Sequence, residues 1–220
     1  MNISKLIVTE QDYPDHISIH LDKLFINIII YYIYNLMSTY NIILDLDNTL
    51  INSLTFKELK MLDEKHQNKF VYNDMGKYYR VFERPHLQPF LDFVFSNFNV
   101  SIWTAASQDY AAFVIKEFIL TKPSRKLDFV LFSYHCDISH EMFNCTKDPE
   151  LIWTILKLPN YSPENTVILD DLQKIYRIVN EKYPNLVVKA KYFDVTETKS
   201  YKDKFLEDVV LILKNRFNLT

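Results

Sequence analysis

The chain has 220 residues, which is enough to bury the core of one α/β domain with at most a small extension. Its hydrophobic content of 48% and charged content of 24% are ordinary for a soluble globular enzyme. The formal net charge of -3 argues against direct binding of nucleic acid, because such binding depends on neutralising phosphates with lysine and arginine.

Cysteine content and residue bias bear on where the protein works. The two cysteines, Cys136 and Cys145, are too few for a disulfide framework, so we expect an intracellular protein in the cytoplasm or nucleus. The single glycine, Gly76, and the abundance of Asn, Ile, Lys, Tyr and Phe indicate a bias toward AT-rich codons. Such a bias would suit a protein encoded by a large DNA virus and made in a host cell, or one from a parasite.

An uncharged run from Leu24 to Leu44 is long enough to suggest a membrane span. Polar residues interrupt this run, however, and its end leads directly into an acidic motif, which leaves no linker to a catalytic domain. We therefore expect residues 1–40 to form an N-terminal extension with a packed helix or an extra strand, rather than a membrane anchor. Met37 is a plausible second start, which would make this extension dispensable. The catalytic domain is expected at residues 41–217.

The catalytic domain is predicted to begin with a strand and then a β-hairpin. Asn41–Leu46 is an apolar run that closes on acidic residues, which is typical of a buried parallel strand. Two short strands, Lys69–Tyr72 and Tyr78–Phe82, flank a turn-forming cluster at residues 73–76. This arrangement predicts a hairpin.

Helical and strand patterns alternate after the hairpin. Apolar residues at helical spacing from Leu87 to Phe98 predict one helix, Ser107 caps a second, and Asp148-Pro149 starts a third. A closing helix is predicted around Phe205–Leu213. Apolar segments predict further strands at Val100–Trp103, Phe129–Phe132, Thr166–Leu169 and Leu186–Ala190. The alternation predicts a mostly parallel sheet with helices on both faces, a three-layer α/β fold of Rossmann-like type.

The carboxyl ends of these strands carry the candidates for chemistry, because ligands bind beyond those ends in such sheets. The polar residues there are Asp45, Asp47, Thr104, Asp170 and Asp171. Phosphoryl transfer through an enzyme carboxylate needs a nucleophile, an acid/base group and a cation. Four carboxylates at one site also need a counterion, and Mg²⁺, a hard cation that prefers oxygen ligands, is suited to that role.

Four motifs occur in order along the chain, namely Asp45-Leu46-Asp47-Asn48-Thr49-Leu50, Trp103–Ser107, Lys147 and Asp170-Asp171. Together they resemble the motifs of the haloacid dehalogenase (HAD) superfamily. The resemblance implies that Asp45 attacks phosphorus to form an aspartyl-phosphate. Asp47 would protonate the leaving group and then activate water, while Thr104 and Lys147 would bind the phosphoryl group.

The resemblance also implies the residues around these groups. The Mg²⁺ ligands that it implies are Asp45, Asp47, Asp170 and Asp171. Asp47 would contribute its main-chain oxygen, and Asp170 would act in support. Asn48, Thr49 and Ala105 are expected to contact substrate, and we expect Thr49 to orient Asp47. Asn48 replaces a glycine common in the superfamily, and asparagine tolerates a left-handed turn.

Further residues narrow the resemblance to the small CTD phosphatases, the NLI-interacting-factor group. They are Arg84-Pro85-His86, Phe90-Leu91, Thr104-Ala105, Lys147-Asp148, Cys136 and His140. The resemblance spans about residues 41–217 and implies a β-hairpin insertion without a large cap domain. An open site of that kind favours a phosphorylated protein segment over a small metabolite. The implied substrate is phosphoserine or phosphothreonine, for example in the C-terminal repeat of RNA polymerase II.

Other functions stay open at this point. One is a small-molecule or polynucleotide phosphatase on the same fold, and another is a catalytically idle binding module. A zinc site would need paired C-x-x-C or H-x-x-x-H spacing, which is absent from the candidate group of His135, Cys136, His140 and Cys145. The segment Ser133–His135, which we expect to form a loop, lacks an Arg-Glu pair common in the relatives and leaves the substrate unsettled.

Overall fold

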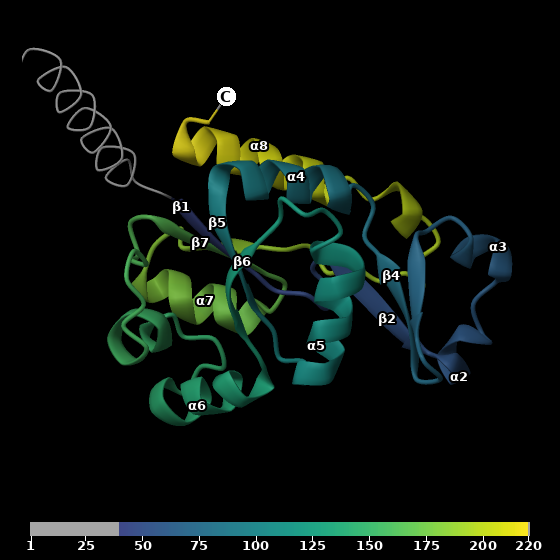
Figure 1. Ribbon diagram of the computed structural model, residues 1–220, viewed down its shortest axis with the longest axis horizontal. Coiled ribbons are helices and arrows are strands. Elements are labelled where there is room, and N and C mark those ends of the chain that lie inside the picture. The colour runs from purple at the N-terminus through teal and green to yellow at the C-terminus, as the bar shows by residue number, and fades with distance from the viewer. Residues whose placement is uncertain (1–39, 220) are drawn as a thin grey trace, which may run out of the picture. The chain divides into compact units, whose positions relative to one another are not determined.

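The computed structural model describes residues 40–219, and the expectations for the N-terminal extension lie outside this range (Figure 1). Its centre is a sheet of five parallel strands in the order β6-β5-β1-β7-β8. These strands are β1 (Tyr40–Leu44), β5 (Phe98–Trp103), β6 (Leu127–Leu131), β7 (Thr166–Asp170) and β8 (Val187–Lys189). The predicted parallel sheet is therefore confirmed.

Helices cover both faces of this sheet and give the predicted three layers. The first face carries α4 (Leu87–Asn97), α5 (Gln108–Val114) and α8 (Phe205–Phe217), and α4 and α8 lie side by side (Figure 1). The second face carries α6 (Ser133–Phe143) and α7 (Gln173–Lys182). Along β1 the side chains alternate, so that Ile42 and Leu44 enter the core beneath the first group and Ile43 the core beneath the second.

Shorter turns complete the main domain. They are two π-helical turns, η2 (Ile115–Ile119) and η3 (Leu151–Ile155), and a 3₁₀ turn, η4 (Ser200–Lys202). Asp148 does not cap a helix as we predicted: η3 begins at Leu151 with Glu150 as its N-cap, although Oδ1 of Asp148 accepts from the N–H of Glu150 at 3.0 Å. Within residues 40–219 no helix has the length and hydrophobicity that a membrane crossing requires.

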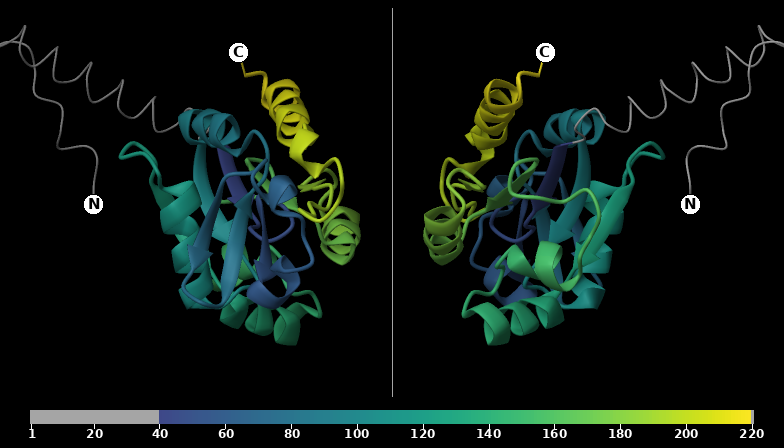
Figure 2. Two further views of the ribbon diagram at one scale, coloured as in Figure 1. Left: turned by 90° about the vertical axis from the view of Figure 1, so that its right-hand side faces the viewer. Right: turned by 90° about the vertical axis from the view of Figure 1, so that its left-hand side faces the viewer.

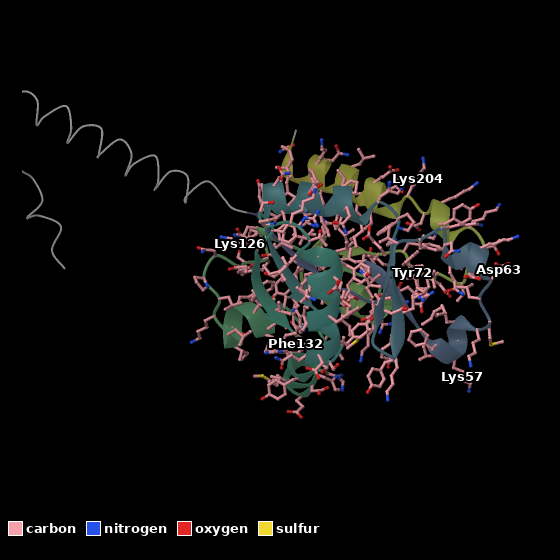
Figure 3. The ribbon with its side chains drawn as sticks, turned by 45° about the vertical axis from the view of Figure 1, so that its right-hand side comes forward. Lys57, Asp63, Tyr72, Lys126, Phe132 and Lys204 are labelled. Carbon is pink, nitrogen blue, oxygen red and sulfur yellow. The ribbon has the colours of Figure 1, made fainter. Side chains whose placement is uncertain are left out.

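A second, antiparallel sheet forms the insertion between the first strand and α4. Its order is β2-β4-β3, from β2 (Ile51–Thr55), β3 (Tyr72–Met75) and β4 (Tyr79–Glu83), with the short helices α2 (Phe56–Leu59) and α3 (Glu64–Gln67). The left view of Figure 2 looks onto this sheet, drawn in blue. Its own small core includes Phe70 and Phe82, and Tyr72, labelled in Figure 3, packs against Phe82 with ring centres 5.6 Å apart. No large cap domain is present in the described residues.

The hairpin is present, but its register differs from the prediction. We expected the turn at residues 73–76, whereas β3 runs to Met75 and the N–H of Tyr78 donates to the carbonyl of Met75 at 3.1 Å. The prediction was wrong because Asp74 pairs across the strands with Arg80, whose Nε lies 2.7 Å from Oδ1 of Asp74. A cross-strand ion pair therefore keeps turn-forming residues inside the strand.

Sequence patterns also missed three elements, namely β2, α6 and α7. Helix α7 buries Ile175 and Val179 at helical spacing, but no side chain caps its first residue, so the signal for a helix start is absent. The segment Ser133–His135 is the first turn of α6 instead of the loop that we expected. These elements are stabilised by packing on the sheet rather than by strong local signals.

One buried ion pair ties the insertion to the main domain. Arg84, which directly follows β4, has a fully buried side chain, and its Nε and Nη2 donate to the two carboxylate oxygens of Asp203 at 3.0 and 3.1 Å. Its Nη1 donates to the carbonyls of Thr49 and Lys191, each at 2.8 Å. This one guanidinium therefore joins three separate segments of the chain.

We predict that Asp203→Asn lowers the free energy of unfolding by about 3 kcal/mol, because it leaves the Arg84 charge buried without its partner. The matched control is Asp74→Asn, which breaks the exposed pair with Arg80 and should cost less than about 1 kcal/mol. Urea unfolding of both variants and the wild type measures the difference. Equal losses in the two variants would contradict the structural role given to Arg84.

Candidate active site

The predicted site residues meet at the carboxyl edge of the parallel sheet. Leu44 at the end of β1 is in register with Ile102 of β5 and Leu169 of β7. The residues that follow these positions, including Asp45 and Asp170, therefore emerge at the same edge. Ligands in open α/β sheets bind at this place.

Lys147 bridges two of these aspartates. Its Nζ donates to Oδ1 of Asp45 at 2.6 Å and to Oδ2 of Asp170 at 2.7 Å. The side chain of Lys147 is 1% exposed, and those of Asp45 and Asp170 are 8% and 0% exposed. A cation that is nearly removed from water is thus paired with two carboxylates that are also removed from water.

Thr49 holds the other oxygen of Asp45. Its hydroxyl donates to Oδ2 of Asp45 at 3.0 Å and lies 3.4 Å from Oδ1 of Asp171. We expected Thr49 to orient Asp47, and this was wrong. The chain turns tightly after Leu46, whose carbonyl accepts from the N–H of Thr49 at 3.3 Å, and the turn directs the hydroxyl back toward Asp45.

Asn48 adopts the left-handed conformation that we predicted, with φ of 59°. Its side-chain amide donates to the carbonyl of Phe193 at 3.1 Å, and the N–H of Phe193 donates to the carbonyl of Asn48 at 2.7 Å. The residue therefore links the loop after β1 to the segment after β8. A contact of Asn48 with substrate stays a prediction.

Three carboxylates form a group that could hold a metal ion. Asp45, Asp170 and Asp171 each offer an oxygen, and these atoms lie within 4.8 Å of one another. Within residues 40–219 this is the only such group of His, Cys, Asp or Glu side chains, and the Asp47 carboxylate is outside it. Three carboxylates against one ammonium leave excess negative charge, and an all-oxygen donor set suits a hard divalent cation.

Burial dominates the electrostatics of this group. It raises the pKa of Asp45 to about 7; Lys147 opposes the rise, and the charges of Asp170 and Asp171 add to it. Burial alone would lower the pKa of Lys147, but the two aspartates that it contacts raise that pKa overall, so Lys147 stays charged. The pKa of Asp171 is also raised, by burial and by Asp170.

Asp47 faces a different partner. Its Oδ1 accepts a hydrogen bond of 2.7 Å from the hydroxyl of Tyr110, on α5. Burial raises the pKa of Asp47, and the bond from Tyr110 opposes that rise. Sequence patterns did not identify this contact. The position of Tyr110 in the first turn of a helix that starts at the sheet edge was the available signal.

Thr104 and Ala105 follow β5 at the same edge. The hydroxyl oxygen of Thr104 accepts from the N–H of Ala106 at 3.1 Å, and Thr104 is buried, whereas Ala105 is exposed. Cys136 donates from Sγ to the carbonyl of Thr104 at 3.5 Å. Cys136 therefore contacts the main chain of a predicted site residue. In the same segment, Nδ1 of His135 accepts a hydrogen bond from the N–H of Phe132, which is labelled in Figure 3.

Comparisons with known proteins identify the family of this chain. A family model described as NLI interacting factor-like phosphatase matches residues 40–218. A CTD phosphatase-like protein of invertebrate iridescent virus 6 is 48% identical over 141 residues, which cover 61% of this chain and 78% of that protein. Its counterpart in invertebrate iridescent virus 3 is 41% identical over 172 residues, which cover 72% of this chain and 88% of that protein. A solved structure of Fcp1, an essential RNA polymerase II CTD phosphatase, has 18% identity and a TM-score of 0.45, with 83% of this chain and 52% of that chain covered.

The raised pKa of Asp45 predicts how stability depends on pH in the absence of metal. The folded chain binds a proton on Asp45 more tightly than the unfolded chain does, so the free energy of unfolding should fall as pH rises from about 4 to about 7. Asp45→Asn should remove this pH-dependent loss of stability, because the asparagine side chain does not titrate. In EDTA at pH 8 the variant should exceed the wild type by roughly 2–4 kcal/mol.

Thermal melts from pH 5 to pH 8 measure this effect, and Asp137→Asn, which changes an exposed aspartate of α6, is the matched control. Addition of Mg²⁺ should stabilise the wild type more than Asp45→Asn, since a ligand stabilises the state that binds it. The same pH dependence of stability in Asp45→Asn and in the wild type would show that Asp45 is not its source.

Proposed function

Because the chain belongs to the NLI interacting factor-like phosphatase family, we propose that it is a Mg²⁺-dependent protein phosphatase that acts through Asp45. Family membership makes the chain a phosphatase of the haloacid dehalogenase type, which hydrolyses phosphoric monoesters. The metal, the role of each residue and the preference for phosphoserine or phosphothreonine in a protein belong to the proposal.

The observation that carries the proposal is the environment of Asp45. One carboxylate oxygen accepts from Lys147 and the other from Thr49, so the side chain is fixed at both oxygens. Fixed orientation favours a nucleophile, because the cost of arranging the reacting groups has been met before substrate binds. The neighbouring ammonium of Lys147 suits a dianionic phosphoryl group that approaches this carboxylate.

The reaction proceeds in two halves. In the first, an oxygen of Asp45 forms a bond to phosphorus, the bond from phosphorus to the ester oxygen breaks, and Asp47 gives a proton to that oxygen. In the second, Asp47 takes a proton from water, whose oxygen attacks phosphorus and releases inorganic phosphate and free Asp45. Lys147 and Thr104 contact the phosphoryl oxygens in both halves, where charge builds up in the transition state.

The donor set fits a magnesium ion. The carboxylates of Asp45, Asp170 and Asp171, with the main-chain oxygen of Asp47, would hold it, and all are hard oxygen ligands. When bound, Mg²⁺ supplies positive charge that offsets the repulsion between the phosphate and the nucleophilic carboxylate. Lys147 by itself cannot balance three carboxylates and a phosphate.

The architecture around the site supports a phosphorylated protein segment as the substrate class. The chain between Asp47 and Thr104 builds the small second sheet instead of a domain that could enclose a metabolite. Exposed tyrosines lie on the β3–β4 hairpin and on α6, namely Tyr78, Tyr79 and Tyr134. A site without an enclosing domain suits an extended peptide, and exposed aromatic rings are common where peptides bind. The viral relatives are described as CTD phosphatase-like, and a phosphorylated RNA polymerase II repeat is the substrate that we propose.

We predict that the protein releases phosphate from p-nitrophenyl phosphate only with Mg²⁺, and that EDTA abolishes release until Mg²⁺ is restored. Asp45→Asn should lower kcat by more than roughly 1,000-fold, because it removes the nucleophile. The exposed Asp137→Asn serves as the matched control. Mg²⁺-independent turnover, or full activity in Asp45→Asn, would contradict the mechanism.

Substrate preference is tested separately, by comparing kcat/KM for a phosphoserine heptad peptide with values for nucleotides and sugar phosphates. A higher value for the peptide supports the protein phosphatase. A higher value for the small molecules assigns the same chemistry to a metabolite or polynucleotide phosphatase. If no substrate is turned over, the chain is a binding module without catalytic activity.

A further inference from the structure

Asp47, the acid/base of the proposed mechanism, depends on a residue outside the four motifs. The Tyr110 hydroxyl lies 2.7 Å from Oδ1 of Asp47, and both side chains are partly buried. The two residues are 63 positions apart in the chain. The contact therefore exists only because α5 packs against the loop that follows β1.

The position of Tyr110 is set from two sides. The side chain of Ser107 accepts from the N–H of Tyr110, and its carbonyl accepts from the N–H of Ala111. Ser107 thereby caps α5, three residues after Thr104. On the other side, the ring meets that of Tyr79 edge to face, with ring centres 5.8 Å apart and planes at 86°. Tyr79 belongs to β4, so the inserted sheet supports the ring that holds Asp47.

We propose that Tyr110 is a positioning residue that fixes the Asp47 carboxylate for proton transfer. The inference rests on the proposed function, since it takes Asp47 as the acid/base. With Oδ1 held by the Tyr110 hydroxyl, Oδ2 is the oxygen that gives the proton to the ester oxygen and later takes one from water. Tyr110 keeps its own proton in both halves of the reaction, so no further proton donor or acceptor is needed.

The physical reason is the sensitivity of proton transfer to geometry. An acid acts only within hydrogen-bond reach of the atom that it protonates, and a carboxylate at the end of a free side chain occupies several rotamers. A hydrogen bond from a neutral donor to one oxygen limits these rotamers. Lys147 fixes Asp45 in a comparable way, so each catalytic carboxylate has its own anchor.

The test uses Tyr110→Phe in the full chain, because it removes only the hydroxyl. We expect kcat/KM for the phosphoserine peptide to fall by about 10- to 100-fold, the effect of losing one hydrogen bond to a charged group. For p-nitrophenyl phosphate the fall should be less than about 3-fold, because the p-nitrophenolate leaves without needing a proton. A purely structural role for Tyr110 would lower both values equally.

The matched control is Tyr161→Phe. Tyr161 donates from its hydroxyl to Oδ2 of Asp128 at 2.8 Å, so this variant removes a tyrosine–aspartate bond of the same kind elsewhere in the domain. It should leave the ratio of the two kcat/KM values unchanged. A thermal melt of each variant checks that the fold is intact.

A double-mutant cycle with Asp47→Asn gives a second, independent measurement. If Tyr110 acts through Asp47, then Tyr110→Phe should change kcat/KM by less than about 3-fold when Asp47 is already replaced. An equal fall for both substrates, or a full additional loss in the Asp47→Asn background, would overturn the proposal for Tyr110 alone. A wild-type protein that releases no phosphate would instead overturn the proposed function, and the inference with it.

Discussion

The parallel pairing of β1 with both β5 and β7 is the constraint on which the site depends. Leu44 lies in register with Ile102 and Leu169, so three strands end level with one another. Since parallel strands point their carboxyl ends the same way, the polar residues after them are brought to one edge. The apolar residues of β1 are fully buried on both faces, which leaves no room for a shift in this register.

The acidic residues that this pairing brings to one edge lower the stability of the fold. Asp45, Asp170 and Asp171 crowd around Lys147, and buried charges destabilise a protein unless they are paired. One ammonium cannot balance three carboxylates, so the metal-free site keeps an excess of negative charge. A loss of stability of this kind is common at active sites, and it agrees with the cation and phosphate binding that we propose for this group.

The inserted sheet contributes to the site as well as to the surface around it. Arg84, which directly follows β4, donates to the carbonyl of Thr49, the residue whose hydroxyl holds Asp45. Tyr79, at the start of the same strand, supports Tyr110 against Asp47. Strand β4 and the residue that follows it therefore reach both aspartates of the proposed mechanism, through one intermediate residue each. The insertion therefore helps to order the residues to which we assign the chemistry.

The sequence by itself determined the alternation of strands and helices, the strand ends that carry Asp45, Thr104 and Asp170, and the family to which the chain belongs. These follow from local patterns, because hydrophobic period and strand-end polarity are properties of neighbouring residues. Only the tertiary structure decided the hairpin register and the partners of Thr49 and Tyr110, along with the bridge that Lys147 makes between two aspartates. The physical reason is distance along the chain: Lys147 and Asp45 are 102 positions apart, and no local pattern can specify which distant group a side chain will meet once the sheet has formed.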